Sequence, residues 1–164
     1  MAGPTVGTFS KGLRVSRNQA RFAGKINSWV SQTDERMNYV HREATWKLIK
    51  EMQNTVPYKD GYLKASLSTS LNLAPLPADV EAIGNPGTWN EQVAYDLVHD
   101  STYEDRIVSN YTMVYARRLE YGFTGTDSLG RSYNQPPRGW VRKAAQKWKR
   151  FVALSVQEAK GKIK

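Results

Sequence analysis

In the first third of the chain, apolar residues recur every three or four positions. This period is that of an amphipathic helix. Unbroken over residues 18–54, the helix would be about 55 Å long, which is long for a domain of this size, and the polar residues 31–35 can cap a new helix. We therefore predict a break or a bend near Ser31 to Thr33, and the helical segment after it ends before Pro57. The apolar positions are Phe22, Ile26, Trp29, Val30, Met37, Val40, Ala44, Leu48, Ile49 and Met52.

The central third predicts short strands separated by loops. Apolar and polar residues alternate from Lys64 to Asn72, and residues 106–109 include two β-branched side chains, so both segments favour strands. Residues 73–88 hold three prolines and two glycines, which favours a loop. The apolar spacing from Trp89 to Val98 indicates one short helix.

The last third predicts two helices joined by a polar loop. A helical period returns over residues 111–121, and Gly122 supplies a left-handed stop. Residues 125–134 are polar, contain two glycines and are predicted to form a loop. The final helix should begin at Pro136 or Pro137, because the first turn does not need the N–H that proline lacks. Its buried stripe is predicted to be Val141, Ala144, Trp148, Phe151 or Val152, Ser155 and Ala159.

For each of the five tryptophans, a core position is the safer prediction. Trp29, Trp89 and Trp148 lie on the predicted buried faces. Trp46 and Trp140 lie near the edges of those faces, where a large amphipathic ring can instead anchor a subunit interface.

The composition is that of one domain. A chain of 164 residues with 40% apolar and 11% aromatic residues can bury one sizeable core. We predict a single domain over residues 17–164, preceded by an extended or mobile arm over residues 1–16. The absence of cysteine excludes disulfides and thiolate chemistry. No apolar run approaches about 18 residues and no signal peptide is evident, so we expect a soluble protein without membrane contact.

Charge is distributed unevenly around a net value of +9. Residues 1–25 carry five cations and no acid (+5), residues 26–135 carry ten cations and fourteen acids (−4), and residues 136–164 carry nine cations and one acid (+8). One interpretation is that both basic ends are simply solvated. The other is that the ends face DNA or an acidic neighbour, while the acidic centre meets basic surfaces of sister subunits.

The sequence contains no signature of catalysis or cofactor binding. A Gly-rich phosphate loop, a nucleophile elbow and a zinc-protease motif are all missing. His41 lies within a predicted helix, and His99 has no second histidine at ligand spacing. The adjacent carboxylates at 34–35 and at 104–105 point apart, so neither pair converges for acid-base work. We therefore expect no enzyme, no cofactor and no metal site.

Glu120 differs from the other carboxylates, because it lies among apolar residues and one turn or less after Arg117 and Arg118. It can form an ordinary ion pair along its helix. Alternatively, it holds an arginine of the core or of the next subunit. The sequence leaves these possibilities open.

Three groups of residues follow one another along the chain in a distinctive order and spacing. They are Pro57, Gly61, Leu63 and Ser66, then Asn110, Tyr115, Ala116, Leu119, Glu120 and Gly122, then Gln135, Pro137, Gly139, Val141 and Arg142. In this order and spacing they resemble the signature of the tail-completion proteins that join head and tail in tailed bacteriophages. The match covers about residues 20–155. It departs from the family at Lys59-Asp60, where the family has Asp-Thr, and in the longer loop over residues 123–133.

The resemblance implies an α+β subunit with long N-terminal and C-terminal helices packed on a small antiparallel β-sheet. It further implies a structural virion protein, assembled in the host cytoplasm, that forms a homo-oligomeric ring in the neck. The ring would join the portal-connector proteins to the tail tube protein and contact genomic DNA transiently, with a hexamer favoured over a dodecamer. The alternative function is a basic module that binds DNA without sequence preference.

Two groups of side chains are candidates for these contacts. Aromatic and charged residues around Glu120 are expected at the subunit interface, and exposed cations of the last helix are expected to face the DNA lumen or an acidic partner. The interface candidates are Glu120, Arg117, Arg118, Tyr115, Tyr121 and Trp140. The lumen candidates are Lys143, Lys147, Lys149 and Arg150.

Overall fold

The computed structural model describes residues 17–163 of the chain. Over this range the fold is α+β, as predicted, with two small antiparallel sheets in place of one. The predicted arm over residues 1–16 lies outside the described residues. In chain order, the elements are α1 (Arg17–Thr55), α2 (Tyr62–Ala65), β1 (Leu67–Leu71), α3 (Glu91–Asp100), β2 (Ile107–Tyr111), α4 (Ala116–Tyr121), β3 (Phe123–Thr126), β4 (Ser132–Gln135), α5 (Trp140–Gln146) and α6 (Trp148–Lys162).

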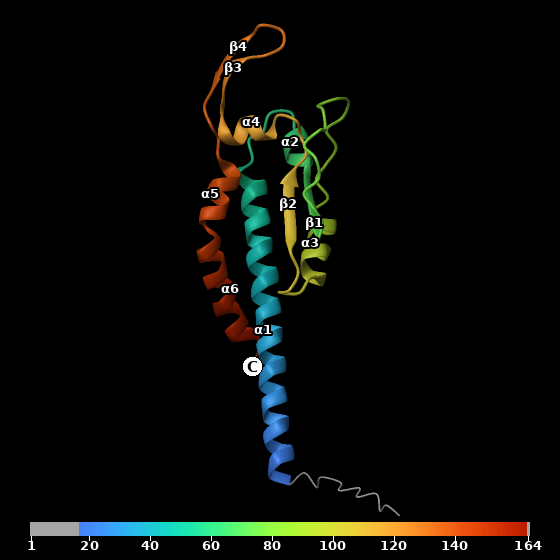
Figure 1. Ribbon diagram of the computed structural model, residues 1–164, viewed down its shortest axis with the longest axis vertical. Helices are drawn as coiled ribbons and strands as arrows, with labels where there is room; N and C mark the ends of the chain where they lie inside the picture. Colours follow the sequence, from blue (N-terminus) through green and yellow to red (C-terminus); the bar gives the residue numbers. More distant parts are fainter. Residues whose placement is uncertain (1–16, 164) are drawn as a thin grey trace, which may run out of the picture.

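α1 is the axis of the molecule (Figure 1). α5 and α6 return along one side of it, while β1, β2 and α3 lie along the other side. The β3–β4 hairpin projects at one end of the molecule, and the first turns of α1 project at the opposite end. We call these turns, residues 19–31, the stalk, because every side chain in that range is exposed.

The predicted break near Ser31 to Thr33 is wrong. α1 runs through these residues as one helix of 39 residues, about 58 Å long at 1.5 Å per residue. The Thr33 hydroxyl donates to the carbonyl oxygen of Trp29 at 2.8 Å. It therefore bonds back into its own helix and does not cap a new one. The predicted end is confirmed, since α1 stops at Thr55, just before Pro57.

β1 and β2 form an antiparallel pair, in which Leu67 lies opposite Tyr111 and Leu71 lies opposite Ile107. Both strands were predicted, the first with a start that was too early. Lys64 belongs to the short helix α2 and not to β1. The sheet therefore holds five residue pairs. These pairs join two segments that lie about 40 residues apart in the sequence.

The helix predicted over residues 111–121 is wrong in its first half, because α4 begins only at Ala116. Just before α4, the backbone of Thr112 forms hydrogen bonds with two other segments. The Thr112 amide donates to the Ser66 carbonyl at 3.1 Å, and the Thr112 carbonyl accepts the Val80 amide at 3.0 Å. Tertiary hydrogen bonds therefore outweigh the helical apolar period here.

The segment 125–134 was predicted to be a loop, but most of it forms the β3–β4 hairpin. Asp127 organises the turn. Its carboxylate accepts the backbone amides of Leu129 and Arg131, both at 2.9 Å, and the Arg131 side chain at 2.7 Å. The alternation signal was weak because each strand has only four residues.

Asp127→Ala should loosen this hairpin without unfolding the body of the subunit. The hydrogen bonds, led by that from the Arg131 amide, hold the pKa of Asp127 below its ordinary value of 3.8. A lowered pKa stabilises the fold above the ordinary value, and this stabilisation is lost as the pH falls through the folded-state pKa. The protection factors of the Leu129 and Arg131 amides against hydrogen exchange should therefore fall in the variant at neutral pH, and in the native chain as the pH drops through the folded-state pKa, which lies below 3.8. Unchanged exchange in the variant would show that strand pairing alone holds the turn.

The core lies between α1, α5 and the β1–β2 sheet. The tryptophans predicted to be buried differ from the one that is most buried in this core. Trp140 is 2% exposed, whereas Trp29 and Trp148, predicted to be buried, are 65% and 39% exposed. Periodicity shows which side chains share a face, but not whether another element covers that face. The apolar core residues that are at most 2% exposed are Ala44, Ile49, Val98, Met113, Trp140, Ala144 and Ala159.

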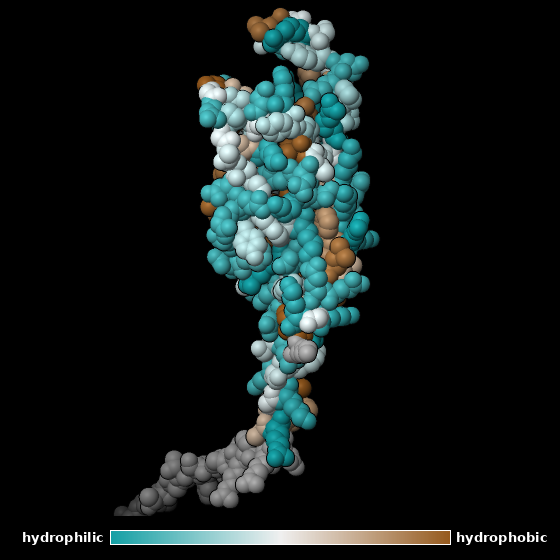
Figure 2. All heavy atoms as spheres, turned by 180° about the vertical axis from the view of Figure 1, so that it is seen from behind, coloured by the Kyte–Doolittle hydropathy of each residue, from teal (hydrophilic) through white to brown (hydrophobic). Residues whose placement is uncertain are grey.

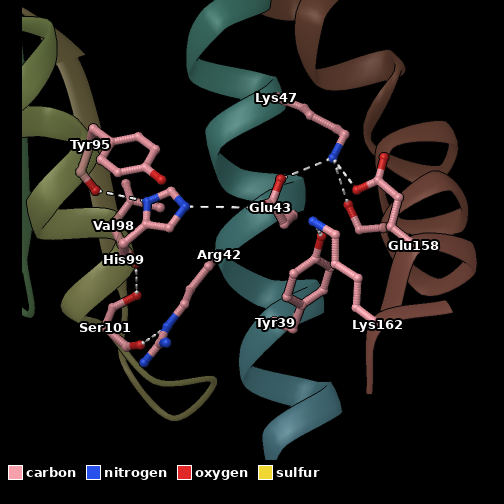
Figure 3. Close-up of polar contacts among 11 residues, drawn as sticks. Tyr39, Arg42, Glu43, Lys47, Tyr95, Val98, His99, Ser101, Glu158 and Lys162 are labelled. Atoms are coloured by element: carbon pink, nitrogen blue, oxygen red, sulfur yellow. Dashed lines mark hydrogen bonds and ion pairs between the residues drawn. The ribbon is translucent and has the colours of Figure 1, made fainter. Parts of the chain in front are cut away.

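Polar contacts hold α1 between α6 and α3 (Figure 3). Lys47 pairs with Glu43 of its own helix at 3.2 Å and with Glu158 of α6 at 2.9 Å. Burial acts to lower the pKa of Lys47, but the two carboxylates outweigh it and raise the pKa. On the opposite side, Arg42 donates to the Ser101 carbonyl at 2.6 Å. These contacts fix α1 in the body and so set the direction in which the stalk projects.

Candidate functional site

Glu120, near the end of α4, is buried against the start of α5. The residue is 6% exposed, and its carboxylate accepts the backbone N–H groups of Val141 at 3.1 Å and of Arg142 at 3.0 Å. The Arg142 side chain donates to the same carboxylate from Nε at 3.2 Å. N–H groups in the first turn of a helix have no partner within that helix. Glu120 therefore caps α5 from a different helix, a contact we call the Glu120 latch.

Two glycines with positive φ surround the Glu120 latch. Gly122 has φ 79°, and a Cβ at this position would lie 2.8 Å from the Gln135 carbonyl oxygen and 3.0 Å from the Pro137 ring. Gly139 has φ 62° and ψ 34° immediately before α5. Its amide donates to the Glu120 carbonyl at 3.1 Å. Glycine adopts such conformations at little cost, and its lack of a side chain leaves room for the neighbouring segment of the same chain.

α5 begins at Trp140, and the predicted start at Pro136 or Pro137 is therefore wrong. The helix begins only where Glu120 supplies acceptors for its first N–H groups. The predicted single C-terminal helix is also divided at Lys147 into α5 and α6. Three positions of its predicted stripe are confirmed as buried, and they are Ala144, Ser155 and Ala159.

The Glu120 latch joins two of the three motif groups on which the resemblance rests. The main-chain carbonyl of Leu119 accepts the Arg138 amide at 2.8 Å, so the backbones also meet. The partner of Glu120 is Arg142, 22 residues further along the chain, and not Arg117 or Arg118 as an ordinary helix pair would require. The separated motif residues are therefore neighbours in space.

Trp140 and Tyr111 pack together beneath the Glu120 latch. Their ring centroids are 5.4 Å apart, with the planes at 74°, an edge-to-face arrangement favoured by aromatic pairs. Burial raises the pKa of the Tyr111 hydroxyl above its ordinary value. Trp140 thus anchors the core, and the prediction that its ring reaches a neighbouring subunit is corrected.

The interface candidates divide into buried and exposed side chains. Glu120 and Trp140 are enclosed by their own subunit, and Tyr115 packs partly buried against the core. Glu120 is therefore an intramolecular anchor, one of the possibilities that the sequence left open, and 8% of its side chain is exposed. The exposed candidates are Arg117, Arg118 and Tyr121.

The four basic candidates of the C-terminal helices also differ. Lys147 pairs with Glu51 of α1 at 2.5 Å, and Lys143 donates to a backbone carbonyl oxygen at 3.0 Å. Both side chains therefore have partners within the subunit. Lys149 and Arg150 are exposed and make no hydrogen bond or ion pair with residues 17–163.

The stalk is a surface that sequence reasoning missed, because its apolar stripe was assigned to the core. Phe22 and Trp29 are 67% and 65% exposed, and apolar side chains interrupt the hydrophilic surface of the narrow stalk (Figure 2). One signal was present in the sequence. A helix of about 55 Å is longer than a small domain can cover, so part of it must project if it does not break.

The described residues contain neither a metal site nor a helix that could span a membrane. Among residues 17–163, no three metal-ligating side chains converge, and every helix is too short or too polar to span a bilayer. His41 is half-buried, and that burial lowers its pKa. His99 stacks on Tyr95 with ring centroids 3.7 Å apart. His41 is therefore partly enclosed by the protein, and His99 packs against an aromatic ring.

In comparisons with known proteins, no family model, no curated protein and no solved structure matched this chain.

Proposed function

We propose that this chain is a structural subunit of a tailed-bacteriophage virion, acting by geometry and not by catalysis. In the proposal, copies form a ring in the neck, with a hexamer favoured over a dodecamer. The ring joins the portal-connector proteins to the tail tube protein and lets genomic DNA pass.

The observation that supports the proposal most strongly is the spatial meeting of the motif groups at the Glu120 latch. Glu120 and Arg142 bond to each other, and Gly122 and Gly139 have the positive φ angles that permit the approach. A motif whose parts depend on one another physically is less easily matched by coincidence than scattered identities. The proposal therefore rests on the order of these residues in the sequence and on their meeting in this fold.

The exposed surfaces fit an assembling subunit. The body presents Arg117, Arg118 and Tyr121 beside the latch, and the stalk presents an apolar face that the other described elements leave exposed. Large exposed apolar surfaces on a soluble subunit mark sites of association. In a closed ring, each subunit offers one such surface to a different surface of the next.

A second candidate function is a DNA-binding module without sequence preference, which the free side chains of Lys149 and Arg150 favour. Cations that are not paired within the subunit can neutralise phosphates and release counterions. They carry no base information, so either function predicts contact with DNA of any sequence.

The two functions are separated by the state of the purified full-length chain. We expect rings in electron micrographs, either in solution or on phage particles, and weak binding of duplex DNA by the free subunit at about 0.15 M salt. The double substitution Lys149→Gln and Arg150→Gln should leave rings intact and reduce retention of packaged DNA in a salt-dependent way. Lys59→Gln with Lys64→Gln, which changes two exposed lysines elsewhere, is the matched control. A chain that never associates with phage particles and binds duplex DNA tightly as a monomer is a DNA-binding module.

A further inference from the structure

The stalk carries a contiguous apolar face that the other described elements of the subunit leave exposed. Phe22 and Trp29 are 67% and 65% exposed, and Ile26 and Val30 are 45% and 43% exposed. Spacings of three, four and seven residues place these side chains on one side of the helix.

The stalk cannot fold back onto its own body, because α1 is one unbroken helix. Trp29, at the base of the stalk, lines a groove together with Tyr103 and Lys160 of the body, and polar contacts with the body follow just beyond it. The Tyr103 hydroxyl donates to Asp34 at 3.3 Å, and Arg36 donates to the Ile163 carbonyl at 3.1 Å. The body reaches no nearer to the N-terminus than this groove, as the projecting helix in Figure 1 shows. Within residues 17–163, no other element covers the apolar face, so the face is available to another molecule.

A groove of complementary character lies between β1, the loop that follows it and α3. Its volume is about 510 Å³. Leu76, Val80 and Val93 line it and are 50%, 46% and 59% exposed. Asp79 also lines it, and Asp96 follows Val93 by one turn of α3. We call this the acidic groove.

Charge complementarity links the two surfaces. Between residues 65 and 105 the chain has seven carboxylates and no lysine or arginine. One of the seven, Glu91, pairs with Lys50 at 2.6 Å. Asp79 lines the groove, and Asp96, one turn after Val93, accepts the Gln92 side chain at 2.6 Å. The stalk, in contrast, contains Arg21 and Lys25 and no acid. The two surfaces therefore attract each other and both offer apolar area.

The same charges disfavour the competing partners within this protein. Two stalks packed face to face would bring like charges together. A second groove, of about 590 Å³ at the base of the stalk, is lined by Trp29 itself and by Arg36 and Lys160, so its charges have the same sign as those of the stalk. Of these two grooves in the described part of the chain, the acidic groove is the one that combines exposed apolar side chains with opposite charge.

We propose that the stalk of one subunit docks in the acidic groove of the next copy of the chain. This inference rests on the proposed ring function and supplies its contact. The two surfaces are different and lie on different parts of the subunit, so each copy can donate a stalk and accept another. That arrangement is a heterologous interface, which closes into a ring when the rotation between subunits permits.

The apolar area available is a substantial part of what an interface needs. An aromatic side chain buries about 150–250 Å², so covering the exposed two-thirds of Phe22 and Trp29 removes roughly 200–300 Å². A specific interface typically buries about 800 Å² per partner. Ile26, Val30 and the charged residues around them supply further area.

Charge reversal tests the pairing directly. Arg21→Glu with Lys25→Glu reverses the stalk, and Asp79→Lys with Asp96→Lys reverses the groove. In the full-length chain at high concentration, each double variant alone should sediment as a monomer, and an equimolar mixture should recover the native oligomer. Lys149→Glu with Arg150→Glu, which changes the net charge as much as the stalk reversal does, should assemble normally. Native chain that stays monomeric at the highest soluble concentration, or reversals that leave assembly unchanged, would overturn the docking.

Crosslinking identifies the partner of the stalk, since the chain has no native cysteine. A short bifunctional thiol reagent should join Trp29→Cys chains to Val93→Cys chains. Linkage of Trp29→Cys chains to one another would indicate stalk-to-stalk pairing and sink the proposal. The outcome is separable from the proposed function. Oligomers that form by this contact but never join phage particles contradict the virion role alone, whereas charge-reversed chains that still assemble in virion necks contradict the docking alone.

Discussion

Replacing Glu120 with alanine should destabilise the folded subunit by about 2–4 kcal/mol, because buried N–H groups and a guanidinium lose their acceptor. Those donors are the amides of Val141 and Arg142 and the Arg142 side chain. At about 2–4 °C per kcal/mol for a chain of this size, the melting temperature should fall by roughly 5–15 °C. Thermal unfolding followed by circular dichroism measures both quantities.

Glu120→Gln separates shape from charge in the same site. The glutamine amide keeps an oxygen that can accept a hydrogen bond from an N–H group. The Glu120→Gln chain should therefore be destabilised less than the Glu120→Ala chain. Glu35→Ala removes an exposed carboxylate from α1 and should change stability by no more than about 0.5 kcal/mol. A Glu120→Ala chain that melts like the native one but fails to assemble would restore the interface role predicted from sequence.

Gly122→Ala should be the most damaging single methyl addition in the described chain. The backbone has φ 79°, where side chains are strained, and the new Cβ would lie 2.8 Å from a main-chain oxygen. Strained backbone costs about 1–3 kcal/mol, and relieving the collision requires the end of β4 to move away from α4. We expect a fall in melting temperature of roughly 5–10 °C and a loss of the Glu120 latch.

Gly24→Ala is the matched control for this substitution. Gly24 lies within α1 with nothing inside 4 Å of the added Cβ, so alanine should stabilise the helix by about 0.5–1 kcal/mol. Equal effects at the two positions would show that backbone entropy, and not the close approach at Gly122, determines the result. Protection of the Val141 and Arg142 amides from hydrogen exchange should fall only in Gly122→Ala.

Both predictions bear on how assembly experiments must be interpreted. The Glu120 latch fixes the start of α5 against α4, and the same segment presents the exposed side chains of Arg117, Arg118 and Tyr121. A variant that loosens the latch will displace these residues and can lose a ring without touching an interface. Melting data therefore have to precede any conclusion about which residues contact a neighbouring subunit.

The amino-acid sequence by itself determined the helical period of α1, its end near Pro57, the two strands of the first sheet and the α+β class. These features depend on local spacing and on backbone chemistry such as that of proline, which act wherever the chain lies. The sequence also marked Glu120, Gly122 and Gly139 as special, although it could not name the partner of the carboxylate.

The tertiary structure alone decided which apolar faces are covered and which polar groups meet. Phe22 and Trp29 share the period of Ile49 and Met52, yet only the latter pair has other elements packed against it. Likewise, Glu120 finds Arg142 across 22 residues, beyond the reach of any helical spacing. Burial and hydrogen bonding depend on what the rest of the chain brings alongside, and a local pattern carries no information about that neighbour.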